Sequence, residues 1–417
     1  MAQLSTLRKS GMPRLLQGSE QYFPALIAAI DGATQWVQLE TYIFDLHYSG
    51  SDVAEALVRA ARRGAVVQVL VDGIGSEARP TDWQQKMLQA GVQWFVYSPL
   101  AAGLGGFGLL VPDRWRRLHR KLCVVDKYTV FCGGINILDD FYDPNHGVLQ
   151  AARFDFAVAV TGSLAAEAAE AMALLWWRVQ AGYPARQNHL SAAWETFKAA
   201  GYGGRIGAGR LATEAADLFP ANAANFGPRS ALVLRDNLLH RNSIEGVYRK
   251  AIGRAHHEIL IANAYFVPGF RLRRALVKAA ARGVRVTLLL QGRYEYFMQY
   301  HAARPVYGAL LAAGIEIYEY EASFLHAKVA VIDGHWATVG SSNLDPLSLL
   351  LAREANVVVE DGAFAEELCD RVRTAIASHG RRIDPVAYSK RPLGQRILDH
   401  IAYALMRLVI FLTGERY

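Results

Sequence analysis

The sequence predicts an α/β fold made of two pseudo-symmetric halves. Two observations carry this prediction. Strand-like and helix-like segments alternate along the chain, which is typical of sheets covered by helices. One stretch also occurs twice, since residues 56–73 align without gaps on residues 275–292 with ten of eighteen positions identical. An internal repeat of this kind indicates a duplicated structural unit.

Each copy of the repeat predicts a helix, a glycine and a buried strand. The helical run is rich in Ala, Leu and Arg and ends at Gly64 or Gly283, where a glycine can adopt the left-handed conformation of a C-terminal cap. The β-branched and leucine-rich run that follows predicts the strand.

Matching segments flank the repeat in both halves. Upstream of the repeat we expect a strand at residues 36–44 in the first half and 258–266 in the second, each preceded by a helix, at 23–33 and 244–255. Downstream we expect a helix–strand segment at 88–97 and at 311–320. We expect the first half at residues 1–183, a connection rich in Gly, Ala and Asn at 184–230, the second half at 231–390, and a C-terminal amphipathic helix at 391–417.

Composition narrows the class of protein and its partners. The chain has 45 Lys and Arg against 38 Asp and Glu, a formal net charge of +7, which favours a polyanionic partner, either nucleic acid or an anionic membrane. Three cysteines without a CxxC pair indicate neither a zinc site nor a disulfide framework and fit a reducing compartment. No apolar segment follows the basic N-terminal residues, so a secretory signal is not expected.

One polar pattern appears once in each half with identical spacing. Its members are His119, Lys121, Asp126, Gly133, Gly134 and Asn136 in the first half, and His326, Lys328, Asp333, Gly340, Ser341 and Asn343 in the second. On a strand, His and Lys two residues apart face the same side, and an imidazole beside an ammonium suits a phosphoryl group. The Asp has the opposite parity and begins a turn, so we expect a structural role for it. The small residues and Asn offer N–H groups to phosphate oxygens.

This paired pattern resembles the HxKxxxxD signature of the phospholipase D superfamily, and the resemblance covers residues 15 to 390. Within that superfamily the segments at 15–44, 69–76 and 391–412 are similar to the bacterial cardiolipin synthases, particularly the short type without N-terminal transmembrane helices. The resemblance implies two phospholipase D-like α/β/α sandwich halves with one active site between them. It implies no metal and no other cofactor.

The resemblance also implies a two-step transfer. His119 would attack phosphorus to form a phosphohistidine, and His326 would act as general acid and then as general base. Lys121, Lys328, Asn136 and Asn343 would stabilise charge on the phosphoryl oxygens. The implied catalytic set is therefore His119, Lys121, Asp126, His326, Lys328 and Asp333, with Ser341 among the groups that bind or orient the phosphate.

A carboxylate downstream of each histidine is implied too, because it fixes the tautomer and supports the imidazolium. In the second half we expect Glu354 to serve His326. In the first half the counterpart is Asp155, displaced by an extra loop at residues 142–150, and we expect it to serve His119. Either carboxylate could instead be a solvated charge at a strand edge.

Three features indicate contact with a membrane surface. Arg114, Arg116, Arg117 and Arg120 form a basic cluster, which is either a solvated face or the place where an anionic head group arrives. Residues 101–112 are apolar and rich in glycine, as in a buried loop or a loop that enters lipid. Residues 401–412 are apolar except Arg407, but twelve helical residues reach only about 18 Å against a hydrocarbon core of about 30 Å.

Such a helix packs on the core or lies in the membrane interface, and we favour the interface because Ile397, Ile401, Leu405, Leu408 and Leu412 recur at helical spacing. We therefore expect a cardiolipin synthase that joins two phosphatidylglycerols with release of glycerol, peripheral on the cytoplasmic face of the bacterial inner membrane, with no nucleic-acid partner. The alternatives are a phospholipase D-type phosphodiesterase acting on lipid or nucleic acid, and a lipid-binding protein with a vestigial site. Intact paired motifs argue against the vestigial site, and the apolar tail and loop argue against the nuclease.

Overall fold

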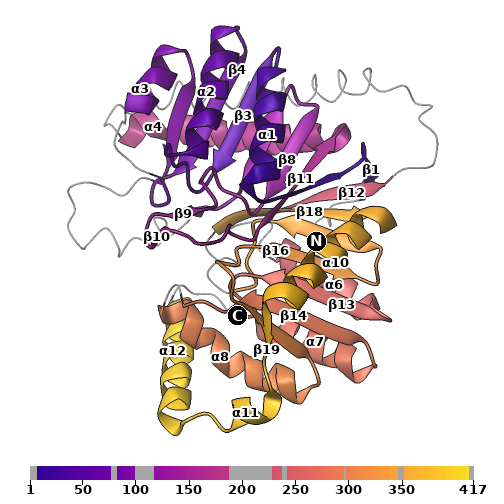
Figure 1. The fold of residues 1–417 in the computed structure, drawn as a ribbon. Helices are drawn as coiled ribbons and strands as arrows, with labels where there is room; N and C mark the ends of the chain where they lie inside the picture. The colour runs from indigo at the N-terminus through magenta and orange to yellow at the C-terminus, as the bar shows by residue number, and fades with distance from the viewer. Residues whose placement is uncertain are drawn as a thin grey trace.

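The computed structural model describes residues 7–76, 82–98, 117–186, 228–236, 242–294, 297–345 and 352–412. It confirms the predicted α/β fold with two sheets, one in each half, and the halves are stacked on one another (Figure 1). The expected loop at 101–112, Arg114, Arg116 and most of the expected connection at 184–230 lie outside the described residues.

The first half contains a seven-stranded sheet. Its strands in spatial order are β2 (Arg14–Gln17), β11 (Phe156–Thr161), β8 (Thr129–Gly133), β7 (Leu122–Val125), β3 (Trp36–Thr41), β4 (Val66–Asp72) and β5 (Gln93–Tyr97). Helices α1 (Gly18–Asp31), α2 (Ser49–Arg62) and α3 (Asp82–Gln89) cover its outer face, and α4 (Ser163–Arg186) packs on the inner face. A short hairpin, β9 (Tyr142–Asp143) and β10 (Gly147–Val148), occupies the predicted extra loop.

The second half repeats this plan around a larger sheet. Its strands in order are β1 (Arg8–Lys9), β12 (Arg229–Arg235), β18 (Ala352–Glu360), β17 (Trp336–Gly340), β16 (Lys328–Ile332), β13 (Glu258–Asn263), β14 (Arg285–Gln291), β15 (Glu316–Tyr320) and β19 (Gly380–Arg382). Helices α6 (Ser243–Arg254), α7 (Phe270–Ala281) and α8 (Phe297–Ala312) lie outside, and α10 (Gly362–His379) lies inside. The short strand β6 (Arg117–Leu118) pairs with the start of β18 and so links the two halves.

The repeated elements form where the sequence predicts them. Gly64 and Gly283 end the two repeat helices with φ of +99° and +90°, a conformation that costs little only for glycine. The two motif hairpins turn at Asp126–Lys127 and Asp333–Gly334, where all four residues have positive φ, as in a two-residue type I′ turn. Both turns hold their hairpins in the same register, β7 with β8 and β16 with β17.

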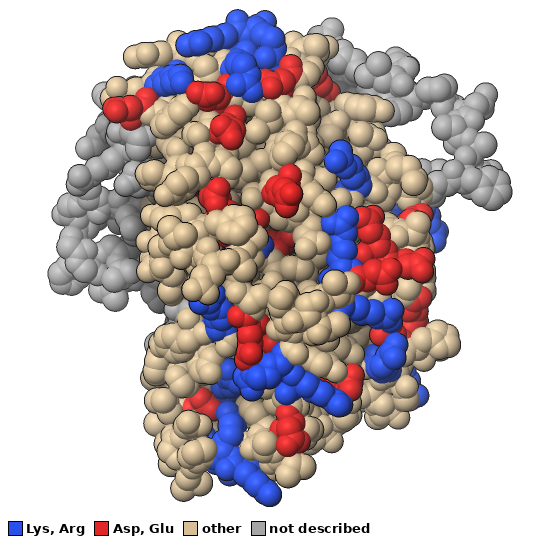
Figure 2. All heavy atoms as spheres, in the orientation of Figure 1, with Lys and Arg blue, Asp and Glu red and all other residues tan. Residues whose placement is uncertain are grey.

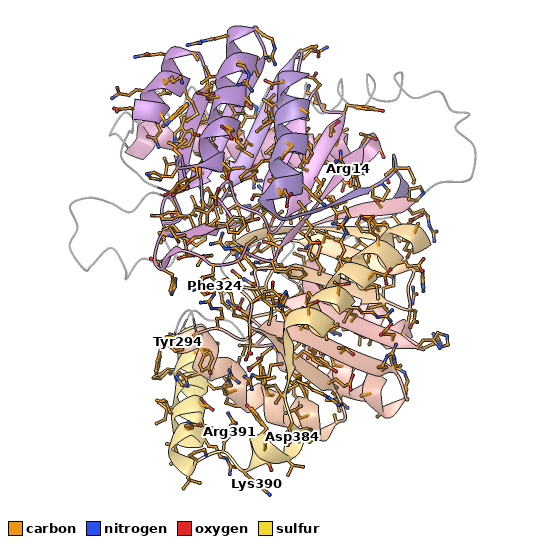
Figure 3. All side chains as sticks on the ribbon, in the orientation of Figure 1. Arg14, Tyr294, Phe324, Asp384, Lys390 and Arg391 are labelled. Atoms are coloured by element: carbon orange, nitrogen blue, oxygen red, sulfur yellow. The ribbon has the colours of Figure 1, made fainter. Side chains whose placement is uncertain are left out.

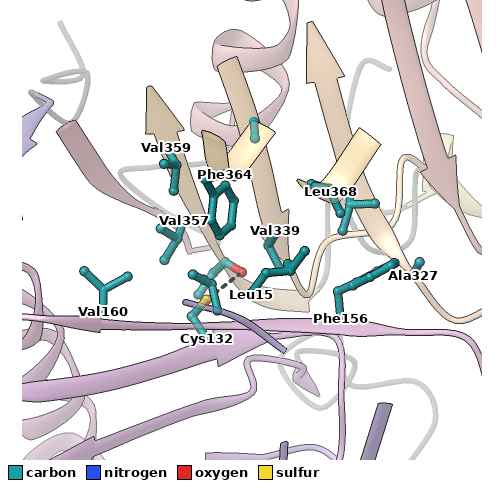
Figure 4. Packing of buried hydrophobic residues seen from close by; sticks show 14 of the residues in the cluster. Leu15, Cys132, Phe156, Val160, Ala327, Val339, Val357, Val359, Phe364 and Leu368 are labelled. Carbon is teal, nitrogen blue, oxygen red and sulfur yellow. Dashed lines mark hydrogen bonds between the residues drawn. The ribbon is translucent and has the colours of Figure 1, made fainter. Parts of the chain in front are cut away.

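One hydrophobic core joins the halves. It draws on Leu15, Cys132, Phe156 and Val160 of the first half and on Val339, Val357, Phe364 and Leu368 of the second (Figure 4). The Cys132 thiol donates a hydrogen bond across the junction to the Ala355 carbonyl oxygen at 3.6 Å. Each outer helical layer has a separate core of its own. The halves therefore share buried apolar surface rather than meeting at a wet interface.

The chain ends in α11 (Pro385–Ser389) and α12 (Leu393–Leu412), and α12 packs along α8 (Figure 1). Ala402 and Met406 are buried against α8, while Ile397, Ile401, Leu405 and Leu408 on the other face are about half exposed. Within the described ranges, no helix combines the length and the apolar character needed to cross a bilayer.

Candidate active site

The two His-x-Lys segments meet at the junction of the halves because each one pairs with the opposite half. The backbone N–H of His119 donates to the Arg353 carbonyl oxygen at 3.0 Å, and that of His326 donates to the Phe154 carbonyl oxygen at 2.9 Å. Phe324, two residues before His326, lies at this junction in Figure 3. Arg353 and Phe154 directly precede the two candidate carboxylates, so these backbone bonds bring each carboxylate to a histidine of the other half.

The carboxylates therefore cross over. His119 Nδ1 lies 2.9 Å from Glu354 Oε1, and His326 Nδ1 lies 2.6 Å from Asp155 Oδ2. Our expectation that each carboxylate serves the histidine of its own half was wrong. Asp155 and Glu354 nevertheless occupy corresponding positions in the two halves, as expected. Asp155 directly precedes β11, which pairs with Gly133, and Glu354 lies on β18, which pairs with Gly340 in the same way.

Each carboxylate is buried and orients one imidazole. Asp155 is 1% exposed and Glu354 is 0% exposed, so neither is solvated as an edge charge would be. A carboxylate that accepts the Nδ1–H bond fixes the tautomer in which Nε2 carries the lone pair. Both histidines are thus arranged to present a nucleophilic or basic Nε2.

The environments of the two carboxylates differ. The Ser341 hydroxyl donates to Glu354 Oε2, whereas Asp155 Oδ1 accepts the N–H of Phe156 at 2.8 Å. Gly134 occupies the position of Ser341 in the first half, and a Cβ there would lie 2.3 Å from Asp155 Oδ1. The sequence difference between Gly134 and Ser341 therefore has a steric reason.

Both motif lysines are buried beside the histidines. Lys121 is 2% and Lys328 is 0% exposed. Lys121 Nζ donates to the His119 carbonyl oxygen at 2.9 Å, and Lys328 Nζ donates likewise to His326. Burial lowers the pKa of Lys121 to about 7, so this ammonium is poised to gain from an anionic ligand.

Burial also shifts the pKa of both motif histidines and of Asp155. Burial lowers the pKa of His119, and the Glu354 carboxylate partly offsets this. Burial and both lysines hold the pKa of His326 well below its ordinary value, while burial raises the pKa of Asp155 to about 7. Without a ligand, both imidazoles are therefore neutral near pH 7. His119 also contributes to the lowered pKa of His326, so the two motifs share one electrostatic environment.

The motif asparagines lie at the same edge of the sheets. Asn136 is 7% and Asn343 is 3% exposed. Asn136 Oδ1 accepts the N–H of Ile43 at 3.1 Å, which directs its amide oxygen to the backbone. Its Nδ2 is then the end that can donate to a phosphate oxygen.

The motif aspartates do not join the site. Asp126 accepts the N–H groups of Thr34, Gln35 and Trp36 at 2.8–2.9 Å, and Asp333 accepts those of His256, His257 and Glu258 at 2.8–2.9 Å. Both lie at the turn ends of β7 and β16, away from the histidines. The structural role that strand parity predicts is confirmed, and their place in the catalytic set implied by the resemblance is corrected.

Two positioning residues escaped the sequence analysis. Asp72 Oδ2 accepts the N–H of Leu118 at 2.8 Å, and Gln291 Oε1 accepts the N–H of Leu325 at 3.0 Å. Leu118 and Leu325 immediately precede the two histidines. Asp72 and Gln291 occupy the same position of the repeat, next to last in each copy, so a polar residue ending both buried strands was the signal. Tyr42 was also missed, and its ring lies 5.0 Å from the His119 ring.

The described part of the basic cluster is internally paired. Arg117 Nη1 lies 3.2 Å from Asp72 Oδ1, and Arg120 Nη2 lies 2.9 Å from Glu40 Oε2. Arg120 is 4% exposed, so it belongs to the interior and is not a solvated face. In the part of the chain that is described, no cluster of three or more His, Cys, Asp or Glu has the arrangement of a metal site.

Two halves of this architecture, with paired His-Lys motifs meeting at their junction, define an enzyme of the phospholipase D class. The sequence model described as "Cardiolipin synthase, PLD-like domain" matches residues 26–152 and 248–375. The chain belongs to this cardiolipin synthase family of phosphatidyltransferases.

Individual relatives agree with this assignment. The chain is 34% identical over 419 residues to "Cardiolipin synthase B" of Shigella flexneri and of Escherichia coli K12, covering 98% of this chain and 90% of each relative. It is 28% identical over 400 residues to "Cardiolipin synthase A" of Cronobacter sakazakii, covering 95% and 75%. The crystal structure of phosphatidylserine synthase from Haemophilus influenzae has the same fold, with a TM-score of 0.66 at 14% identity over 97% of this chain and 96% of that one.

Proposed function

We propose that this enzyme joins two phosphatidylglycerol molecules into cardiolipin and releases glycerol through a phosphohistidine intermediate. The observation that carries the proposal is the pair of histidines, each held by a buried carboxylate of the opposite half and each followed by a buried lysine. Such a site offers one nitrogen nucleophile and one proton carrier to a single phosphodiester.

In the first step, Nε2 of His119 attacks the phosphorus of one phosphatidylglycerol. The bond from phosphorus to the glycerol oxygen breaks, and His326 gives its Nε2 proton to that oxygen. The Glu354 carboxylate stabilises the imidazolium character that His119 acquires as the N–P bond forms. The negative charge of a bound phosphodiester favours the protonated form of a nearby imidazole. His326 can therefore carry a proton when the substrate is bound, although its pKa is low in the free enzyme.

In the second step, the terminal hydroxyl of a second phosphatidylglycerol attacks the same phosphorus. His326 accepts the hydroxyl proton, the N–P bond breaks, and His119 returns as a neutral imidazole. Lys121, Lys328 and the amide groups of Asn136 and Asn343 hold the phosphoryl oxygens and stabilise the charge of both transition states.

We also propose that the enzyme works from the membrane surface, as a peripheral protein on the cytoplasmic face of the bacterial inner membrane. Supporting this, α12 presents Ile397, Ile401, Leu405 and Leu408 to the outside while its opposite face packs on α8. Tyr294 and Phe297, 54% and 47% exposed, extend the apolar surface at the start of α8, and Figure 3 shows Tyr294 beside α12 below the junction. Burial of such a stripe at the acyl boundary gives an interfacial helix its binding free energy.

The test is lipid analysis after the purified protein is incubated with phosphatidylglycerol vesicles. We expect cardiolipin and glycerol in equal amounts, and loss of both with His119→Ala or His326→Ala, each of which should leave the fold intact. Phosphatidic acid as the main product would make the enzyme a hydrolase of the same fold. Turnover that stops in EDTA would contradict the histidine mechanism.

A further inference from the structure

A basic groove runs along the outside of the second half, between α6 and α7. It has a volume of about 680 Å³, and its lining includes Arg249, Lys250, Arg271, Arg274, Lys278 and Arg282. Gly246 and Gly253 form part of the α6 side, and a Cβ at either position would face open space. The groove is therefore wide because two helix positions carry no side chain.

Because the fold is duplicated, the charge of this groove can be compared with that of the corresponding surface in the first half. Arg63 of the first half donates to the carbonyl oxygens of Ile30 and Ala33, and Arg282 donates in the same way to those of Ile252 and Ala255. These matching bonds align α1 with α6 and α2 with α7. They also show that Arg282 has a structural role common to both halves.

At three aligned positions where the first half is acidic, the second half is neutral or basic. Asp31, Asp52 and Glu55 of the first half correspond to Gly253, Arg271 and Arg274 of the second. Figure 2 shows acidic and basic side chains next to one another over the helices at the top of the view, where the first half lies. The basic groove is therefore not required by the fold.

The consequence is clearest at one lysine. In the first half Arg59 makes a bidentate ion pair with Asp31, at 2.9 and 2.8 Å. In the second half Lys278 stands in place of Arg59, and Gly253 stands in place of Asp31. No acidic residue is among the described residues that line the groove. Glu245 of α6 lies 3.9 Å from Arg249 and also interacts with Arg271. The positive charge of the groove is thus largely uncompensated within the described protein.

One end of the groove lies near the active site. Phe266 forms a bridge with Leu344, the residue after Asn343, and α7 begins four residues later at Phe270. Four residues span at most about 14 Å. Phe270 is 58% exposed, so an aromatic ring stands beside the basic side chains at this end. Helix α7 also packs beside α8, whose first turn carries exposed Phe297.

We propose that the α6–α7 groove is a docking site for the phosphate head groups of anionic phospholipids in a bilayer. Basic side chains match the phosphates, exposed Phe270 matches the interfacial region, and α7, one wall of the groove, packs beside α8. The choice of a lipid over another polyanion rests on the proposed function. Each basic residue near an anionic surface strengthens binding by roughly 1 kcal/mol, which is about fivefold.

The experiment compares vesicle binding by variants with matched charge, all in a His119→Ala background so that no turnover occurs. The groove variant is Arg274→Glu with Lys278→Glu. The control is Arg14→Glu with Arg62→Glu, two exposed basic residues of the first half whose reversal changes the net charge equally. A third variant, Gly253→Asp, restores the acid of the first half, and it is expected to fold because a Cβ there meets nothing.

On vesicles of phosphatidylcholine with phosphatidylglycerol, the groove variant should bind at least about tenfold more weakly, and Gly253→Asp a few-fold more weakly. The control should bind like the parent, and all proteins should bind pure phosphatidylcholine equally. Equal loss in groove variant and control would overturn the proposal, since net charge alone would explain binding. The lipid proposal would also be overturned, in favour of a nucleic-acid site, if the groove variant bound vesicles like the parent but no longer bound a labelled oligonucleotide.

Activity separates this proposal from the catalytic one. With His119 restored, the groove variant should make cardiolipin at the wild-type rate from detergent-dispersed phosphatidylglycerol. If the wild-type protein makes no cardiolipin but the binding difference persists, the docking site stands and the proposed reaction fails. If the groove variant also loses activity in detergent, the groove belongs to the catalytic machinery and the docking proposal fails.

Discussion

The two motif histidines differ most in the groups that hydrogen-bond to their carboxylates. Glu354 receives a serine hydroxyl in addition to His119, whereas Asp155 receives one backbone N–H and lies against Gly134. Each carboxylate can therefore be altered separately to ask which histidine forms the covalent bond. The crossing of the pairs means that the variant in one half reports on the histidine of the other.

The first prediction uses a phosphatidyl ester of p-nitrophenol, a leaving group that needs no general acid. With His119 as nucleophile, Glu354→Gln should slow the burst of p-nitrophenol about a hundredfold or more, because the imidazolium loses its carboxylate. Asp155→Asn should keep the burst and slow only the later turnover, so that phosphohistidine accumulates. Stopped-flow absorbance and mass spectrometry of the alkaline-quenched protein measure both effects. The opposite pattern would assign the nucleophile to His326.

The second prediction concerns pH. As pH falls through about 7, Asp155 takes up a proton and no longer accepts the His326 Nδ1–H bond as a carboxylate. As pH rises through about 7, Lys121 loses its proton and its charge on the phosphoryl oxygens. The profile of kcat/KM on detergent-dispersed substrate, which reports the free enzyme, should be bell-shaped with its maximum near pH 7. Lys121→Met should remove the alkaline limb from the residual activity, and a flat wild-type profile would contradict this account.

Among the elements, patterns local to one half could be predicted from the residues, whereas the particular residue pairings between the halves could not. Glycine stops, strand runs and the aspartate turns follow from short-range geometry, and they appear where the sequence predicts them. Strand parity also separated Asp126 and Asp333 from the histidines. The two-residue period of a strand predicts which face of the sheet a side chain lies on, but not which residue of the other half contacts it. The pairing of Asp155 with His326 could therefore not be predicted from strand parity.

The C-terminal helix shows the same limit. Its apolar spacing was visible in the sequence, but packing and membrane contact were posed as alternatives. In the structure one face of α12 packs on α8 and the other leaves an apolar stripe exposed. Asp399 anchors the packed face, since it accepts bonds from His301 at 2.8 Å and Arg391 at 2.9 Å. Removing the whole helix would therefore expose α8 as well as delete the apolar stripe.

The third prediction separates these faces with neighbouring residues. Leu405→Glu with Leu408→Glu should leave the melting temperature unchanged and reduce vesicle binding and activity on vesicles, because both side chains are about half exposed. Met406→Glu should lower the melting temperature strongly, because Met406 is 3% exposed and a buried carboxylate costs several kcal/mol. Thermal unfolding and vesicle co-sedimentation measure the two outcomes. Full membrane binding by the double variant would mean that the α12 stripe is not the membrane contact.

At the scale of the whole molecule, duplication has produced one site and one shared core. Each motif histidine is paired with a buried carboxylate of the other half, so neither half contains a complete motif pair by itself. The core at the junction contains side chains of both sheets and of α4 and α10, so the apolar surface that stabilises one half is provided partly by the other. The site and the stability of the enzyme thus depend on the same junction.

The last prediction follows from that shared core. Multidomain chains commonly unfold in separate steps, but separating these halves would expose a buried apolar cluster, so we expect a single cooperative transition. Phe156→Ala, at a fully buried position in the junction, should cost about 3–5 kcal/mol and shift that transition as a whole. Hydrogen exchange read by mass spectrometry should show β7–β8 of the first half and β16–β17 of the second losing protection together, by the same free energy. Loss of protection confined to the first half would show that the halves are independent domains. The site could then be lost while the second half stays folded.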